Sequence, residues 1–166
     1  MNTFLKFPLL FMTCILLAIS CKVIVQEEKP NIILIFTDDL GIEALKSYGG
    51  HSTATPNIDK LAEEGMLFTH LFANPACSPS RAEIMTGTYP SDNGIKHVLT
   101  HFKDDTFLNP NEFKSFANQL KAGGYATAIA GKWNLSYLEK NNTIESFGFD
   151  EHCLWQMYDK TGVKRS

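Results

Sequence analysis

The feature that most constrains the fold is an apolar run at residues 31–37, which ends abruptly at a pair of carboxylates, Asp38 and Asp39. The run is rich in β-branched residues, and such continuous apolar stretches are typical of strands that are buried on both faces. The carboxylate pair and the glycine that soon follows it are typical of a turn. We therefore predict a buried central strand with Asp38 and Asp39 at its carboxyl end, where open α/β sheets bind ligands.

Helix and strand patterns then alternate along the chain. Residues 55–65 begin with a Thr-Pro pair and end with glycine, which suits an N-cap, a first helical position and a terminator. Residues 66–73 are apolar enough to form a second strand. Residues 78–87 repeat the capped-helix pattern, so Cys77 is expected at a helix N-terminus.

A further helix and strand follow in the second half. Apolar residues recur at helical spacing around residues 113–120, and residues 125–130 form another apolar run after a glycine pair. Alternating strands and helices favour a mostly parallel sheet covered by helices. The predicted fold class is therefore α/β, with a mostly parallel central sheet and helices on both faces.

The N-terminus has the pattern of an export signal. A lysine precedes an apolar stretch at residues 7–19, which is short for a membrane span but suits a signal-peptide core. The following Ser20 and Cys21 resemble a bacterial lipobox, in which the cysteine is lipidated. We predict a lipoprotein-type signal peptide at residues 1–21 and a linker at residues 22–30; an ordinary cleaved signal is the alternative.

Composition limits the remaining possibilities. Hydrophobic residues at 44%, charged residues at 20% and a net charge of -3 indicate a globular protein and exclude nucleic acid as an expected partner. Only Cys77 and Cys153 lie beyond the signal, so there is no disulfide framework. A bridge between these two cysteines stays open, because sequence does not supply its geometry.

Cys77 begins the motif Cys-Ser-Pro-Ser-Arg, which ends at Arg81. The motif resembles the Cys-x-Pro-Ser-Arg signature of the sulfatase family, in which the cysteine is oxidised to formylglycine. Further segments match that family in order: Lys29 to Asp39, Thr55-Pro56-Asn57-Ile58-Asp59, Thr86-Gly87-Thr88-Tyr89-Pro90 and Gly131-Lys132-Trp133. The resemblance implies an alkaline phosphatase-like fold.

The resemblance extends from about Lys29 to Asp150 and matches only the front portion of the family's catalytic domains. It implies that residues 31–166 are the N-terminal part of such a domain, so we expect the fold to be incomplete. Further metal ligands and a general acid come from the later portion in this family. We therefore expect this chain to be inactive and poorly soluble by itself, since a sheet without its later strands exposes apolar surface.

The resemblance also assigns the site. Cys77, as formylglycine, is the implied nucleophile: one hydroxyl of its hydrate attacks sulfur and the other later expels sulfate. Asp38, Asp39 and the converted side chain of Cys77 are the implied ligands of one divalent cation, Ca²⁺, which takes hard oxygen ligands. Arg81 and Lys132 complete the implied catalytic set, and Lys132 also binds the sulfate group.

Asn134 marks a departure from the family, which usually has histidine after Gly-Lys-Trp. Asparagine can hydrogen-bond substrate but cannot transfer a proton at neutral pH. Without the family context, Asp38 and Asp39 would be a solvated turn and Arg81 a surface side chain. Two alternatives therefore stay open, a non-catalytic remnant and a phosphate or phosphonate monoester hydrolase of the same superfamily.

The same resemblance implies partners and a location. A sulfatase hydrolyses a sulfated small molecule or glycan, and its cysteine is converted by a formylglycine-generating or anaerobic sulfatase-maturing enzyme. With the export signal and a lipid on Cys21, the expected location is the periplasm or outer membrane of a bacterium, where the protein would be membrane-anchored.

Overall fold

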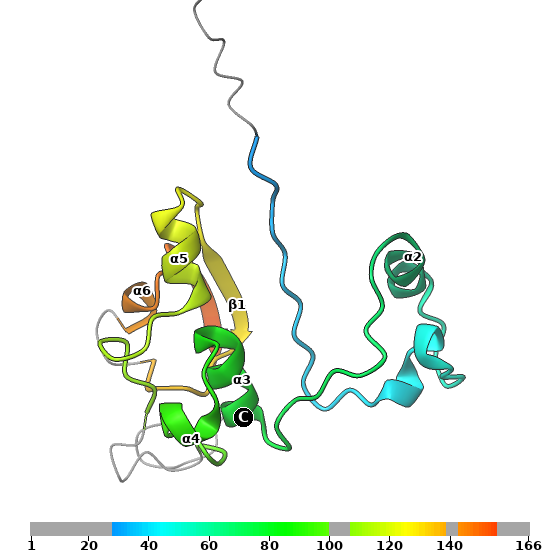
Figure 1. The fold of residues 1–166 in the computed structure, drawn as a ribbon, viewed down its shortest axis with the longest axis horizontal. Coiled ribbons are helices and arrows are strands. Elements are labelled where there is room, and N and C mark those ends of the chain that lie inside the picture. The colour runs from blue at the N-terminus through cyan, green and yellow to red at the C-terminus, as the bar shows by residue number, and fades with distance from the viewer. Residues whose placement is uncertain (1–27, 100–106, 139–142, 156–166) are drawn as a thin grey trace, which may run out of the picture. The chain divides into compact units, whose positions relative to one another are not determined.

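The computed structural model describes residues 28–99, 107–138 and 143–155 (Figure 1). Its contacts divide the chain into two units, Met1–Thr37 and Asp38–Ser166. The predicted signal peptide, Cys21 and most of the linker lie outside the described residues. Within the part that is described, no helix is long and apolar enough to cross a membrane.

The prediction of a strand at residues 31–37 is wrong. The segment carries no regular secondary structure, and Ile33 and Ile35 are 84% and 78% exposed. The predicted strand at residues 66–73 is also absent, and its Phe72 is 88% exposed. Both segments have strand-like composition, but a strand also requires a hydrogen-bonded neighbour, and the described residues offer none to either segment.

The regular elements of the described residues all lie in the second unit. In chain order they are η1 (Ile42–Ala44), η2 (Lys46–Tyr48), α2 (Pro56–Glu64), α3 (Cys77–Thr86), α4 (Pro90–Asn93), α5 (Phe116–Ala122), β1 (Ala128–Lys132), α6 (Thr143–Ser146) and β2 (Glu151–Trp155).

The three predicted helices are confirmed as α2, α3 and α5. Thr55 occupies the N-cap position of α2, but its hydroxyl makes no capping bond: it donates to the side chain of Asp59 and accepts from the backbone N–H of Lys46. α3 begins at Cys77, as predicted, and ends at Gly87, whose φ of 67° suits glycine. The N-terminus of α5 is fixed by a capping box between Ser115 and Asn118.

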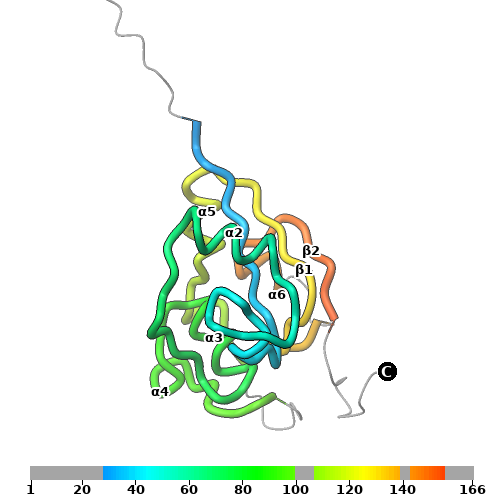
Figure 2. The backbone as a smooth tube through the Cα atoms, turned by 90° about the vertical axis from the view of Figure 1, so that its right-hand side faces the viewer, coloured from blue at the N-terminus to red at the C-terminus, as the bar shows by residue number. Residues whose placement is uncertain are grey.

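The strand predicted at residues 125–130 is found slightly later, as β1. It pairs in parallel with β2, in a register that sets Ala128 opposite Glu151 and Lys132 opposite Trp155. The two strands run side by side in Figure 1 and Figure 2. The predicted parallel sheet is confirmed, and within the described residues it contains these two strands.

A single apolar cluster lies beside this sheet. Its centre includes Trp133, just after β1, whose ring centroid lies 5.4 Å from that of Phe147. The buried members are Ala82, Met85, Ile95, Leu99, Leu108, Ala117, Trp133, Leu135, Ile144, Phe147 and Phe149. Because α3, the residues after β1 and the segment before β2 all contribute, burial of this cluster fixes α3 against the carboxyl end of β1.

Asp150 joins the start of β2 to the residue before β1. Its Oδ2 accepts hydrogen bonds from the backbone N–H of Thr127 at 3.0 Å and from Oγ1 of Thr127 at 2.9 Å. Its Oδ1 lies 2.5 Å from Nζ of Lys121, the last basic residue of α5. The hydrogen bond from Lys121, followed by those from Thr127, lowers the pKa of Asp150 from 3.8 to about 2.

We predict that Asp150→Asn lowers the melting temperature at neutral pH and flattens its acid dependence. The ionised carboxylate stabilises the fold fully above its ordinary pKa of 3.8, and this contribution is lost as pH falls through about 2. Thermal melts of the full chain between about pH 1 and pH 5 measure the effect, because this range extends beyond both pKa values. Asp92→Asn, at an exposed carboxylate of α4, is the matched control and should keep the wild-type pH dependence.

The exposed apolar segments predict self-association of the isolated chain, because contiguous apolar surface of this kind drives association. Size-exclusion chromatography should show species larger than a monomer. Replacing Ile33 and Ile35 together by lysine should shift the distribution toward monomer. A monomeric wild-type chain with a cooperative melt would contradict this expectation.

Candidate active site

The first turn of α3 and the last residue of β1 bring the predicted site residues together. Cys77 is the first residue of α3, and Arg81 follows one turn later on the same side of the helix. Lys132 is the last residue of β1. Asp38 comes from a segment far earlier in the sequence, and its carboxylate contacts both cationic side chains.

The Asp38 carboxylate is the centre of the charged contacts. Nζ of Lys132 donates to its Oδ2 at 2.6 Å, and Nη2 of Arg81 lies 3.4 Å from the same oxygen. The Lys132 side chain is 8% exposed and that of Arg81 13%, whereas Asp38 is 32% exposed. Two cations with little access to water therefore face one partly exposed carboxylate.

Charge states follow from these contacts. The hydrogen bond from Lys132 holds the pKa of Asp38 below its ordinary value, and the charges of Lys132 and Arg81 act in the same direction against burial. Burial alone would lower the pKa of Lys132, but hydrogen bonds to Asp38 and Cys77 outweigh it, so its pKa is raised. Asp38 is therefore an anion and Lys132 a cation at neutral pH.

Arg81 also fixes the backbone of β1. Its Nη1 donates to the main-chain oxygen of Lys132 at 2.8 Å. The guanidinium thus reaches the Asp38 carboxylate with one nitrogen and the end of the strand with another, a geometry that the single ammonium of lysine could not reproduce. This contact holds α3 and Lys132 in fixed relation.

Asn134 lies next to Cys77. It is fully buried, and its Nδ2 lies 2.9 Å from Oγ of Ser78 and 4.0 Å from Sγ of Cys77. Its φ of 55° is left-handed, a conformation that asparagine adopts more readily than most residues. The structure therefore brings Asn134 to the predicted nucleophile.

Asp39 follows Asp38 in a left-handed conformation, with φ of 56°. Adjacent carboxylates and the side chain of residue 77, if it carries oxygen, have the hard-donor chemistry that a divalent cation such as Ca²⁺ requires. The described residues contain no group of three or more His, Cys, Asp or Glu side chains able to hold a metal. These side chains therefore have the right donor chemistry for Ca²⁺, but they supply only some of the roughly six to eight oxygen ligands that the ion takes.

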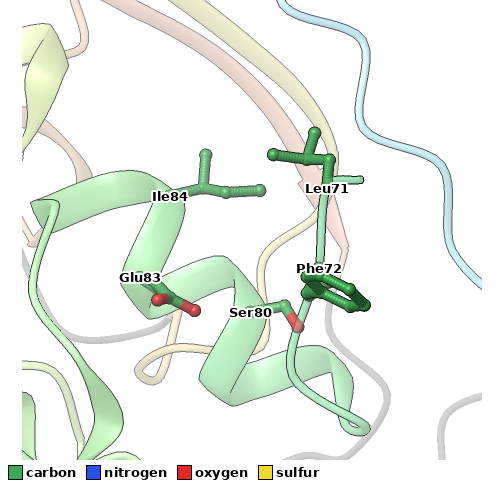
Figure 3. A pocket seen from close by; sticks show the side chains of 6 residues that line it. Leu71, Phe72, Ser80, Glu83 and Ile84 are labelled. Carbon is green, nitrogen blue, oxygen red and sulfur yellow. The ribbon is translucent and has the colours of Figure 1, made fainter. Parts of the chain in front are cut away.

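A pocket lies between α3 and the segment that precedes it, and none of the candidate site residues lines it. Leu71, Phe72 and Ala73 line it from the preceding segment, and Ser80, Glu83 and Ile84 line it from α3 (Figure 3). Its lining is mostly apolar and its one charged group is a carboxylate. Such a pocket does not suit a sulfate group, so it is distinct from the candidate site.

Both described cysteines are free thiols, and the bridge left open by the sequence is not formed. Cys77 is half-buried at the N-terminus of α3, and Cys153 is exposed on β2. Cys77 is therefore available for modification.

A sequence model of the sulfatase family matches residues 30–163 of the chain. This match covers most of the sequence, including Asp38, Cys77, Arg81 and Lys132. The chain belongs to the sulfatase family. The resemblance inferred from the Cys77 motif is thereby confirmed, and with it a hydrolase family acting on sulfuric esters.

Similar sulfatases occur in mammals and in bacteria. The chain is 38% identical to N-acetylgalactosamine-6-sulfatase of Rattus norvegicus over 144 residues, which are 80% of this chain and 27% of that protein. It is 40% identical to N-acetylgalactosamine-6-O-sulfatase of Bacteroides thetaiotaomicron over 138 residues, 75% of this chain and 26% of that protein. The chain thus spans about a quarter of the length of these curated relatives.

Solved sulfatase structures share the fold. The crystal structure of Ps i-CgsB in complex with k-i-k-neocarrahexaose aligns with a TM-score of 0.70 and 34% identity, covering 78% of this chain and 28% of that one. A structure described for glycosaminoglycan metabolism by Bacteroides thetaiotaomicron aligns with a TM-score of 0.66 and 34% identity, over 76% and 28% of the two chains. The fold is therefore alkaline phosphatase-like and partial, as predicted.

Ser78 is the site residue that sequence reasoning missed. It occupies the variable second position of the cysteine motif, so its identity carried no signal there. In the structure it is fully buried and bonds Asn134 twice as well as the backbone of Leu99. Only the three-dimensional approach of α3 to the residues after β1 reveals this role.

A double-mutant cycle with Asp38→Asn and Lys132→Met should give a coupling free energy of about 1 kcal/mol in unfolding. The pair is expected to couple because Lys132 is almost buried and its bond to Asp38 is short. Urea denaturation of the four proteins measures the coupling.

The control cycle uses Glu64→Gln and Lys60→Met. These residues form an exposed i, i+4 pair on α2, 3.7 Å apart, and should couple by only about 0.3–0.5 kcal/mol. Equal coupling in both cycles would contradict a special role for Asp38 and Lys132.

Proposed function

We propose that this chain contributes the nucleophile side of a sulfatase site that cleaves sulfate monoesters through a formylglycine derived from Cys77. The observation that carries the proposal is the position of Cys77 at the N-terminus of α3, one helical turn before Arg81, whose guanidinium bonds the main-chain oxygen of Lys132. Positive charge and backbone N–H groups thus gather where an anionic substrate would meet residue 77.

Lys132 is suited to hold the sulfate group. Its ammonium is protonated, nearly buried and fixed by Asp38, so little ordering is needed when an anion arrives. Arg81 keeps Lys132 in place through the main-chain oxygen and adds a second positive charge. Together they stabilise negative charge that develops on the sulfuryl oxygens as the ester bond breaks.

Residue 77 needs a release step as well as a nucleophile. A formylglycine hydrate supplies one hydroxyl that attacks sulfur and displaces the alcohol, and a second hydroxyl that later loses its proton and expels the sulfate as the aldehyde C=O re-forms. A maturation enzyme, formylglycine-generating or anaerobic, is the partner we propose for this conversion. The half-buried thiol of Cys77 is free, so no competing disulfide prevents the modification.

Asp38, Asp39 and an oxygen of the converted residue 77 would hold the proposed divalent cation, Ca²⁺. When bound, such an ion acts as a Lewis acid and lowers the pKa of a hydroxyl that it contacts. The hydrogen bond from Lys132 and the nearby charges hold the pKa of Asp38 below its ordinary value, which suits this carboxylate to bind a cation at neutral pH.

We propose a sulfated glycan as the substrate class. Support comes from relatives described as N-acetylgalactosamine-6-sulfatases and from a similar structure in complex with neocarrahexaose. Export to the periplasm or outer membrane, with a lipid on Cys21 and hence a membrane anchor, belongs to the same proposal and would bring the protein to extracellular glycans.

The primary test is mass spectrometry of the tryptic peptide that contains Cys77, from the full chain co-expressed with a maturation enzyme. We expect the mass loss that accompanies conversion of the thiol into an aldehyde. Cys77→Ala provides the matched control, in which no aldehyde can form. An unmodified thiol would favour a non-catalytic remnant.

Hydrolysis assays with an aryl sulfate and an aryl phosphate then distinguish sulfatase from phosphatase. A higher kcat/KM for the aryl sulfate than for the aryl phosphate supports the proposal. A preference for phosphate or phosphonate would assign the chain to the other branch of the superfamily. Conversion without turnover would make this chain a binding or precursor fragment.

A further inference from the structure

A buried serine and asparagine next to Cys77 form a small hydrogen-bond network. Oγ of Ser78 donates to the main-chain oxygen of Asn134 at 2.9 Å and accepts from the backbone N–H of Leu99 at 3.1 Å. It also accepts from Nδ2 of Asn134 at 2.9 Å. A hydroxyl has one proton to donate and two lone pairs that accept, so the hydrogen-bonding capacity of the Ser78 hydroxyl is fully used.

The network determines which way the Asn134 amide faces. If the amide were reversed, its Oδ1 and the main-chain oxygen of the same residue would both require the single proton of Ser78. Oδ1 has no partner in either orientation, but reversal would also remove the hydrogen bond from Nδ2 to Ser78 and leave a buried donor unpaired, which costs about 1–3 kcal/mol. The NH₂ end of Asn134 must therefore face Ser78.

This orientation leaves the second N–H of the same nitrogen available beside Cys77. Nδ2 lies 4.0 Å from Sγ of Cys77, at the limit for a hydrogen bond to sulfur. The other end of the amide, Oδ1, is buried and has no hydrogen-bond partner within the described part of the chain. The donor that faces Cys77 therefore has only a distant sulfur as its acceptor, and it can form a shorter hydrogen bond to an oxygen at this position.

We propose that Asn134, oriented by Ser78, is a positioning residue that donates an N–H to an oxygen on the side chain of residue 77. The inference rests on the proposed function, because the oxygen arises when Cys77 is converted. Oxygen accepts a stronger and shorter hydrogen bond than sulfur, so the contact strengthens on conversion. Asn134 thereby acts on the nucleophile and does not bind the sulfate group.

The inference can be tested without conversion, because Cys77→Ser also sets an oxygen at this position. A double-mutant cycle combining Cys77→Ser with Asn134→Leu should show coupling of about fivefold in the unfolding equilibrium constant of the full chain. The cycle combining Cys77→Ala with Asn134→Leu should be additive. Additivity in both cycles would overturn the inference.

Ser136→Ala provides a matched control for Asn134→Leu. Ser136 is buried near Asn134 in the sequence, and its hydroxyl accepts from the Trp133 indole at 2.8 Å. Loss of the Ser136 hydroxyl should destabilise the same segment, but its effect on unfolding should be additive with that of Cys77→Ser. Coupling of equal size at Ser136 would mean that the effect is general destabilisation, and would also overturn the inference.

A spectroscopic measurement covers the case in which Asn134→Leu does not fold. The side-chain amide resonance of Asn134 should move downfield in Cys77→Ser relative to Cys77→Ala, since a hydrogen bond to oxygen deshields the donor proton. A purely structural asparagine would give the same resonance in both proteins, and that result would overturn the inference.

Where the converted chain turns over an aryl sulfate, its kinetics separate this role from substrate binding. Asn134→Leu should lower kcat with little change in KM, whereas loss of a sulfate-binding group would raise KM. A rise in KM alone would overturn the inference. Coupling in the stability cycle without conversion of Cys77 would support the contact and contradict only the proposed function.

Discussion

The position of the first turns of α3 against the carboxyl end of β1 underlies the whole candidate site. Arg81 bonds the last carbonyl of the strand, and Ser78 bonds the backbone just beyond it. Both contacts use buried or nearly buried groups, so losing either would leave a polar atom without water or partner. Cys77 is held near Lys132 because the helix that begins with it cannot shift relative to the strand.

Charge and packing support this position together. The Lys132 ammonium is nearly buried, and the carboxylate of Asp38 compensates its positive charge. A buried lysine without such a partner would have no compensation for the loss of water. Trp133, the next residue, turns its ring into the apolar cluster against Phe147. Of these two consecutive residues, Lys132 therefore belongs to the candidate site and Trp133 belongs to the core.

Sequence patterns predicted the helices well, because their signals are local. The Thr-Pro start and glycine end of α2, and the motif that begins α3, lie within a few residues of the elements they define. β1 was predicted to within a few residues. The roles of Asp38, Lys132 and Arg81 came from resemblance, and the structure brings these three side chains into contact.

Strand predictions failed where pairing decides the outcome. Residues 31–37 and 66–73 have the composition of strands, but composition cannot show whether a neighbouring strand is present. Ser78 was missed for a related reason, since its partners are 21 and 56 residues away in sequence. Contacts of this length are set by the packing of elements and leave no local pattern.

The two bonds between Ser78 and Asn134 have an evolutionary consequence. A change at the variable position of the cysteine motif removes the hydroxyl that orients the amide, and a change at the position after Gly-Lys-Trp removes the amide itself. The Ser78 hydroxyl keeps its bonds to the main chain of residues 134 and 99 with any side chain at 134, but only the amide of asparagine depends on it for orientation. Among sulfatases, these two positions should therefore vary together as a pair, with serine accompanying asparagine.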